Sequence, residues 1–258
     1  MSGTTAAEAV HASSLAELSW VDGAGAPQVR GVVALVRGDD PALAFTYADA
    51  DVARDVAAAS SLALALRETR STGAAFRPLL IRGTPRLVED PRGDLFVDEL
   101  LTQELRRYPP SRIFADSPLL MREHWWYLPR LVVELDVTAT RPIPAREDPD
   151  SHLLVVAHGQ HHEVRAARLV EQSDQVLVLD VDGGYVDDGP AVLFGQDASF
   201  PDLERWSQWR YDGRWEDGSF ILTQAPEWTG LRPAPGLMQR WRRQRTLARQ
   251  CRAAIPGA

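Results

Sequence analysis

The chain has 258 residues, of which 45% are hydrophobic and 25% are charged, and its net charge is −8. This composition is typical of a soluble globular protein with a substantial core, and the acidic charge argues against a general surface for nucleic acids or anionic membranes. All 28 basic residues are arginines, which excludes a lysine Schiff base, and the single cysteine, Cys251, excludes an intrachain disulfide and a cysteine metal cluster.

The chain shows neither an apolar run long enough to span a membrane nor the pattern of a signal peptide. We therefore expect a cytoplasmic protein. Residues 1–14 predict a flexible N-terminus.

Three strands are predicted first, separated by turns rich in glycine and aspartate. Residues 15–22 end at the turn signal DGAGAP, residues 28–36 are β-branched and apolar, and residues 42–47 follow the turn RGDDP. Asp51 can then cap a helix over residues 52–60, whose alanines favour it.

The next elements complete a first domain. Residues 61–69 predict a strand, with a helix left open by their Ala and Leu content, and residues 76–90 predict two strands separated by a break or bulge at Gly83. Residues 91–109 repeat apolar positions at helical spacing, and residues 127–143 form a closing strand. Six strands with two inserted helices lack the alternation of a doubly wound sheet, so a small antiparallel barrel fits better.

A proline-rich, charged stretch, residues 142–152, predicts a domain boundary near residue 145. Four further strands are predicted after it, over residues 152–158, 163–170, 175–181 and 190–195. The aromatic residues 200–215 predict a helix followed by a turn, and residues 237–254 predict a basic helix that pairs with the protein's own carboxylates.

A weak internal similarity links GDDPALAFTYADA (residues 38–50) with DDGPAVLFGQDAS (residues 187–199). The region 146–258 is therefore either a partial copy of the first domain, 15–145, or a second occurrence of a common strand–turn–helix pattern. We favour the second explanation.

Four motifs in order, PQVRGVVALV, ALAFTYADADVARDV, LLIRGTPRLVED and YLPRLVVELDV, resemble the split-barrel flavin-binding family that includes pyridoxamine 5′-phosphate oxidase. The resemblance covers roughly residues 15–143. It implies a mainly β (α+β) fold with a six-stranded Greek-key split barrel and inserted helices, followed by a smaller C-terminal α+β part. It also implies a homodimer with FMN at the dimer interface.

The resemblance implies that Arg30, Thr46, Arg54 and Arg82 contact the cofactor. Arginine forks suit a flavin phosphate, and free N–H groups at a helix start near Asp51 would assist them.

The chain departs from the family at four positions that bear on the flavin. Leu35 stands where a lysine is usual, Asp51 and Val52 replace adjacent basic residues, and Pro78 replaces a glutamine near the flavin ring. These departures weaken the expected phosphate site, because carboxylates repel a phosphate unless arginine pairs with them.

His124, Trp126 and Tyr127 are candidate groups on the substrate side. Their rings can stack on a planar cofactor or substrate, or pack in the barrel and at a dimer interface.

HGQHH carries three further histidines, His158, His161 and His162, between two predicted strands. Such a set could bind a metal or a haem iron, with His124 as a further axial candidate, but no Asp or Cys completes it, so we expect a solvated turn and no metal.

These features together predict an FMN-dependent oxidoreductase that acts on a small-molecule substrate. The alternatives are a non-catalytic ligand-binding or regulatory protein on the same barrel, and a haem- or deazaflavin-binding relative. Hydrolase and NTPase functions lack support, because none of the G-x-S-x-G, G-x-x-x-x-G-K-[ST] and H-E-x-x-H motifs occurs.

Overall fold

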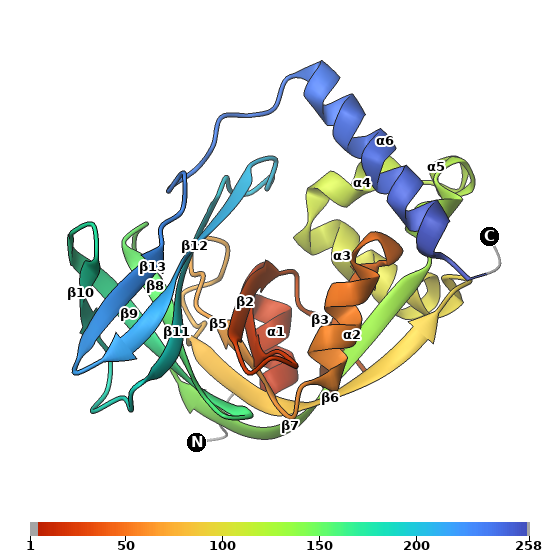
Figure 1. The fold of residues 1–258 in the computed structure, drawn as a ribbon. Coiled ribbons are helices and arrows are strands. Elements are labelled where there is room, and N and C mark those ends of the chain that lie inside the picture. The colour runs from red at the N-terminus through yellow and green to blue at the C-terminus, as the bar shows by residue number, and fades with distance from the viewer. Residues whose placement is uncertain (1–4, 257–258) are drawn as a thin grey trace.

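The computed structural model describes residues 5–256, whose strands form two sheets (Figure 1). The first sheet contains β1 (Ala16–Val21), β2 (Pro27–Val32), β3 (Leu35–Arg37), β4 (Asp40–Thr46), β5 (Leu62–Leu66), β6 (Leu79–Asp90) and β7 (Arg130–Pro142). The second sheet contains β8 (Ser151–His158), β9 (His161–Gln172), β10 (Val176–Val181), β11 (Gly189–Ala198), β12 (Trp206–Glu216) and β13 (Ser219–Gln224). The second sheet closes into a barrel, which we call the C-terminal barrel.

Helices are few and are inserted between the strands or follow them. The α-helices are α1 (Ala6–Ala12), α2 (Ala50–Ala58), α3 (Leu101–Arg107), α4 (Arg112–Ala115), α5 (Pro118–Glu123) and α6 (Leu237–Ala254). Four shorter helical turns are η1 (Tyr47–Asp49), η2 (Phe96–Leu100), η3 (Pro109–Ser111) and η4 (Trp125–Tyr127). The mainly β class with inserted helices is confirmed, and no helix of residues 5–256 is long and apolar enough to cross a membrane.

The first sheet has seven strands because the predicted strand 28–36 divides into β2 and β3. Next to this division, side chains of α3 form hydrogen bonds with backbone groups that would otherwise pair with a neighbouring strand. The amide of Gln103 hydrogen-bonds both the N–H and the C=O of Val36, at 3.0 and 2.7 Å, and Arg107 donates to the carbonyl of Ala34.

The bulge predicted in β6 is confirmed, because the pairing register with β7 shifts between Arg82 and Gly83. A Cβ atom at Gly83 would lie 2.3 Å from the carbonyl oxygen of Asp136. Glycine is therefore required by the close approach of the two backbones.

Two local predictions differ from the structure. Residues 200–215 include β12 rather than a helix, since Ser207, Trp209 and Tyr211 are buried at every second position. Of the predicted flexible start 1–14, residues 1–4 lie outside the described part, and α1 begins at a capping box of Thr5 and Glu8. The motif T-x-x-E that signals this helix is present in the sequence.

The two sheets share one strand order. The first reads β3-β4-β7-β6-β5-β1-β2 and the second reads β10-β13-β12-β11-β8-β9, so that β8 and β9 correspond to β1 and β2, and β11 to β5. The sheets pack through β1 and β2 on one side and β8, β9 and β11 on the other, since β1 contacts β8 and β9 and β2 contacts β8 and β11. The similarity between residues 38–50 and 187–199 links β4 with β11, which hold different places, so it does not follow the shared topology. The proposed domain limits stay a prediction.

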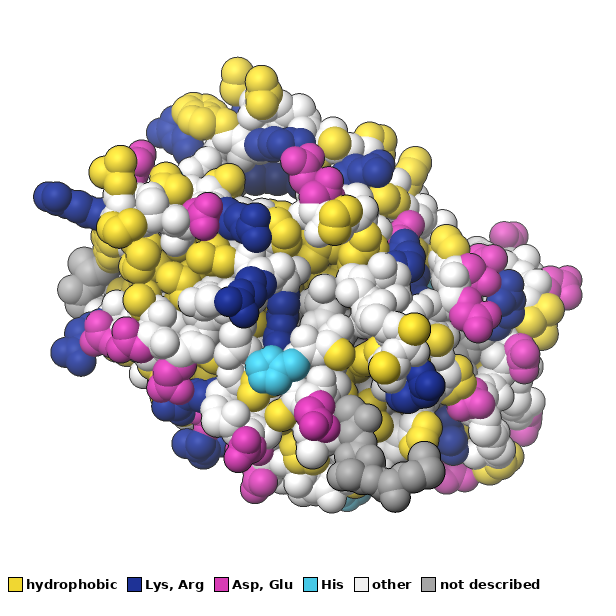
Figure 2. All heavy atoms as spheres, turned by 180° about the vertical axis from the view of Figure 1, so that it is seen from behind, with side chains coloured by type: hydrophobic (Ala, Val, Ile, Leu, Met, Phe, Trp, Pro, Cys, Tyr) yellow, Lys and Arg dark blue, Asp and Glu magenta, His cyan; other side chains and the backbone are white. Residues whose placement is uncertain are grey.

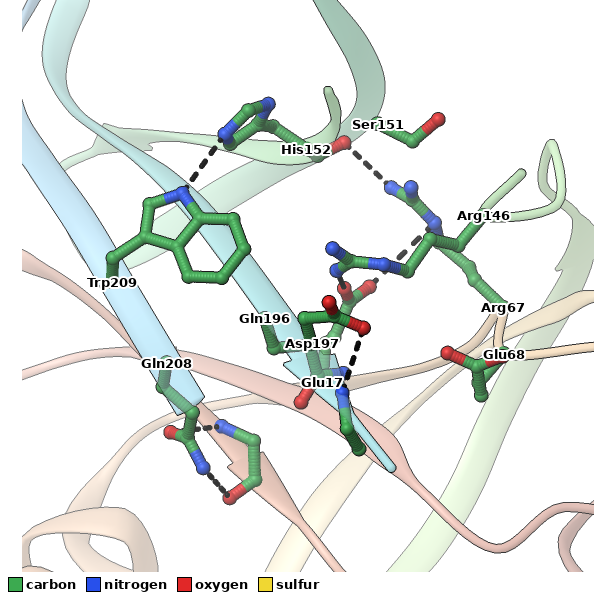
Figure 3. A network of polar contacts seen from close by, with 12 residues as sticks. Glu17, Arg67, Glu68, Arg146, Ser151, His152, Gln196, Asp197, Gln208 and Trp209 are labelled. Carbon is green, nitrogen blue, oxygen red and sulfur yellow. Dashed lines mark hydrogen bonds and ion pairs between the residues drawn. The ribbon is translucent and has the colours of Figure 1, made fainter. Parts of the chain in front are cut away.

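The seam between the two sheets has an apolar part and a charged part. The apolar part consists of Val29, Ala63, Ala65, Leu80, Ile143, Leu153, Val155, Val164, Ala166, Val192 and Phe194. In the charged part, the carboxylate of Glu17 lies 3.6 Å from Arg67 and 3.7 Å from Arg146, all three buried (Figure 3). Arg146 belongs to the predicted linker, which is thus built into the seam.

The HGQHH stretch forms the turn between β8 and β9, as predicted. His162 is not solvated, however, because it is buried against β1 and its Nε2 lies 3.1 Å from the hydroxyl of Ser19. Within residues 5–256, no group of three or more His, Cys, Asp or Glu side chains is placed to hold a metal ion.

Stability is expected to fall as the pH drops below about 6.5 because two histidines are buried without charge. Burial lowers the pKa of His152 to about 4 and, with Arg82 nearby, that of His162 to about 3. Below about pH 6.5 the two histidines bind protons in the unfolded chain but not in the folded chain. Each histidine therefore lowers the free energy of unfolding by up to about 1.4 kcal/mol for each pH unit below that value. Urea unfolding between pH 7 and about 5 would measure this slope.

A pair of neighbouring variants provides the control. His162→Gln should reduce the slope, and His161→Gln, at an exposed position, should leave it unchanged. Equal slopes in all three proteins would contradict the assignment.

Candidate functional site

A cleft of about 700 Å³ lies between the first sheet, the α3–α4 region and α6. Its apolar wall is formed mainly by Val32, Leu35, Leu43, Phe45, Ile113, Phe114 and Leu247. Its charged and hydrogen-bonding side chains are Arg30, Thr46, Asp49, Glu104, Tyr108, Tyr127, Arg130, Asp202, Glu204, Trp206, Arg240, Arg243 and Gln244. The volume is within the range of small-molecule sites, and three of the predicted residues, Arg30, Thr46 and Tyr127, line it.

Both sheets contribute to this cleft. Arg30 is carried by β2, and the next residue, Gly31, exchanges two backbone hydrogen bonds with the side-chain amide of Gln208 on β12, at 3.0 and 3.2 Å (Figure 3). Trp206, at the start of β12, lines the cleft itself. The C-terminal barrel thus positions the strand that bears Arg30.

Helix α6 closes the other side. It follows a long connection from β13 and packs on η1 and η4 (Figure 1). Its C-terminal end is anchored in the core of the first sheet by Cys251 and Ile255, both buried. Arg240, Arg243 and Leu247 therefore face the cleft from a fixed helix.

Arg30 is paired inside the cleft. One of its Nη atoms lies 2.9 Å from Oδ1 of Asp49, and the hydroxyl of Thr46 donates to the other oxygen of Asp49 at 3.4 Å. Asp49 occupies the N-cap position of α2 without capping it through its side chain. The prediction that Asp51 caps this helix is wrong, because Asp51 lies inside the first turn.

The floor of the cleft holds a buried network of three side chains. The hydroxyl of Tyr127 donates to Oε1 of Glu104 at 2.5 Å, and Nη2 of Arg130 lies 3.6 Å from the same oxygen. The Arg130 guanidinium lies 4.2 Å from the centre of the Tyr127 ring and 3.9 Å from that of Phe96. Burial, together with the Glu104 charge, raises the pKa of Tyr127 well above its usual value, so Tyr127 stays protonated.

The other two substrate-side candidates lie elsewhere. His124 and Trp126 line a second space of about 710 Å³ on a neighbouring face of α6, which we call the outer cavity. Nδ1 of His124 lies 3.1 Å from the carbonyl oxygen of Leu120, and Trp126 packs edge-on against Phe114 at 5.4 Å. The aromatic segment is therefore divided between two spaces.

The remaining predicted cofactor contacts do not line the cleft. Arg54 lies 3.6 Å from Glu89, and both side chains are about half exposed. Arg82 donates to the carbonyl of His162 at 2.9 Å, at the seam between the sheets. Both arginines thus make protein contacts outside the cleft.

Sequence reasoning missed the contribution of α6. Arg240, Arg243, Gln244 and Leu247 follow each other at intervals of three, one and three residues, which is one face of a helix. That spacing is visible in the sequence, but the element that this face covers is not.

No protein-family model matches the chain, and no curated protein matches it in sequence. Solved structures that resemble it include a heme binding protein from Mycobacterium smegmatis (12% identity, 98% of this chain and 100% of that one, TM-score 0.36). They also include a pyridoxamine 5′-phosphate oxidase-related, FMN binding protein from Nostoc punctiforme (13%, 79% and 93%, TM-score 0.30) and an F420 reductase (16%, 53% and 96%, TM-score 0.34).

The family that the sequence motifs resemble is thus represented among the similar structures. A ligand for the cleft has to be inferred from the residues of the cleft itself.

Proposed function

We propose that the cleft binds a flavin-type cofactor, FMN in the first place, and that the protein is an oxidoreductase acting on a small molecule. The observation that carries the proposal is the combination of an apolar cleft of about 700 Å³ with three arginines, Arg30, Arg240 and Arg243, in addition to the buried Arg130 in its floor. Apolar walls suit a planar ring, and guanidinium groups suit the phosphate at the end of the flavin's side chain.

The residues present fit such a group. Arg30, Arg240 and Arg243 would hold the anionic end, with Thr46 and Gln244 as neutral partners. The bound flavin would supply the hydride chemistry. The protein would bind and orient it and exclude water, and Tyr127 would stay protonated with its hydroxyl donating to Glu104.

Haem fits the cleft less well. Among the described residues that line it, none is a histidine, and Tyr127 is already engaged with Glu104. A deazaflavin would use the same apolar wall and arginines as FMN, so it stays the closest alternative.

A non-catalytic ligand-binding role is the second candidate function, and a specific observation favours it. Asp49 already neutralises Arg30, and Glu204 lies 3.4 Å from Arg240. Two further carboxylates, Glu104 and Asp202, line the cleft. These carboxylates would oppose a phosphate placed next to them. A purified protein that takes up neither FMN nor a deazaflavin would favour this role.

Arg30 and Asp49 should affect FMN binding in opposite directions. Arg30→Ala should weaken binding about 10- to 150-fold, the value of a charged hydrogen bond. Asp49→Asn should strengthen it roughly twofold to fivefold, because a phosphate would no longer compete with a carboxylate for Arg30. Quenching of flavin fluorescence on titration would measure both.

Arg54→Gln is the control, since Arg54 lies outside the cleft and should leave the affinity unchanged. Weaker binding in Asp49→Asn would show that Asp49 only orients Arg30, and an unchanged affinity in Arg30→Ala would refute the phosphate contact. A homodimer and a cytoplasmic location stay predictions.

A further inference from the structure

Helix α6 carries an excess of positive charge that the protein does not neutralise. Its 18 residues contain no acidic side chain, and its arginines are Arg240, Arg242, Arg243, Arg245, Arg249 and Arg252. Within residues 5–256, only Arg240 lies within 4.0 Å of a carboxylate, that of Glu204 at 3.4 Å. The prediction that this helix pairs with the protein's own carboxylates thus holds for one arginine in six.

Three of the unpaired arginines line the outer cavity. Arg245, Arg249 and Arg252 recur at intervals of four and three residues, so they share one face of α6. Glu123 is the one acidic residue among the described residues that line this cavity. Like charges on one helix face repel each other, so an anion bound between them would be stabilised.

The cavity also offers an aromatic face. Trp241 is half exposed, and the guanidinium of Arg245 lies 4.6 Å from the centre of its ring. Indole and guanidinium faces both stack on planar rings. Hydrophobic side chains next to arginines are visible at the top of the molecule in Figure 2, where α6 begins in Figure 1.

Neutral hydrogen-bonding groups complete the cavity. Nδ1 of His124 lies against the carbonyl of Leu120 and must donate to it, so its Nε2 accepts from the Gln244 amide at 3.2 Å. Thr246 adds a hydroxyl. Gln244 lines both this cavity and the cleft, so the two spaces adjoin on neighbouring faces of α6.

We propose that the outer cavity binds a small organic anion that carries both a planar ring and two or more phosphate groups, as a nucleoside diphosphate does. The arginines at 245, 249 and 252 would bind the phosphates through charge-assisted hydrogen bonds, and Trp241 would stack on the ring. This site is independent of the flavin proposed for the cleft.

The test is calorimetric titration of the full chain with ADP and with inorganic pyrophosphate at low ionic strength. Both should bind, and ADP should bind more tightly. The double variant Arg249→Gln/Arg252→Gln should weaken both at least tenfold, as expected for the loss of two charged hydrogen bonds. Trp241→Leu should abolish the preference for ADP and leave pyrophosphate affinity nearly unchanged.

Two arginines of the same helix serve as matched controls. Arg242→Gln, which lines neither space, and Arg243→Gln, which lines the cleft, should both retain ADP binding. If Arg242→Gln weakened ADP binding as much as the double variant, the overall charge of α6 would account for the effect and the proposed site would be refuted. A loss confined to Arg243→Gln would place the anion in the cleft, and no binding of either ligand would refute the proposal outright.

Discussion

Replacement of Glu17 by alanine is expected to lower the free energy of unfolding by about 3–5 kcal/mol, the cost of breaking a buried ion pair. Glu17, Arg67 and Arg146 are each at most 4% exposed, and they connect β1, the end of β5 and the segment before β8 (Figure 3). Without the carboxylate, two guanidinium groups would remain buried at the seam with no opposite charge between them. Urea unfolding at pH 7 would measure the loss.

The control is an exposed ion pair of the same length. Glu89 and Arg54 are also 3.6 Å apart, but both are about half exposed, so Glu89→Ala should cost less than about 1 kcal/mol. A cost for Glu17→Ala as small as that for Glu89→Ala would show that the buried cluster does not stabilise the seam.

Replacement of Glu104 by alanine should have a similarly large effect, about 3–5 kcal/mol. The carboxylate accepts the Tyr127 hydroxyl and lies beside the Arg130 guanidinium, which is 0% exposed between two aromatic rings. Its loss would leave a buried donor without an acceptor and a buried cation without a counter-charge. Thermal and urea unfolding would give the change in stability.

Tyr127→Phe separates the two contributions. It removes the hydroxyl and keeps the Arg130–Glu104 pair, so it should cost only about 1–3 kcal/mol. If Tyr127→Phe destabilised the protein as much as Glu104→Ala, the hydrogen bond and not the buried charge would account for the effect.

Local patterns in the sequence were sufficient for most of the secondary structure. The bulge at Gly83, the closing strand at β7 and the limits of α6 follow from glycine placement, β-branched residues and helical spacing. Residues 200–215 were misread as a helix, because the aromatic and charged side chains of β12 also fit a helical pattern. Only pairing with β11 and β13 decides between the two.

The candidate site could be predicted only in part. Arg30 on β2, Thr46 at the end of β4 and Tyr127 in η4 all line the cleft, although β2 and β4 are far apart in the strand order of the first sheet. Arg54 and Arg82 carry the same charge but lie elsewhere, one beside Glu89 and the other at the seam. A residue's type is written in the sequence, whereas the face on which it lies depends on the register and twist of its strand.

The sequence by itself determined the mainly β class, the order of the elements and the chemistry available: arginine as the only cation, one cysteine and an acidic balance. The tertiary structure decided that the two sheets share a strand order, that a buried ion cluster joins them, and that α6 lines both the cleft and the outer cavity. The physical reason is distance along the chain. Propensity and periodicity act over a few residues, but burial and charge pairing join Glu17 to Arg146 and Gly31 to Gln208, and no local pattern encodes such partners.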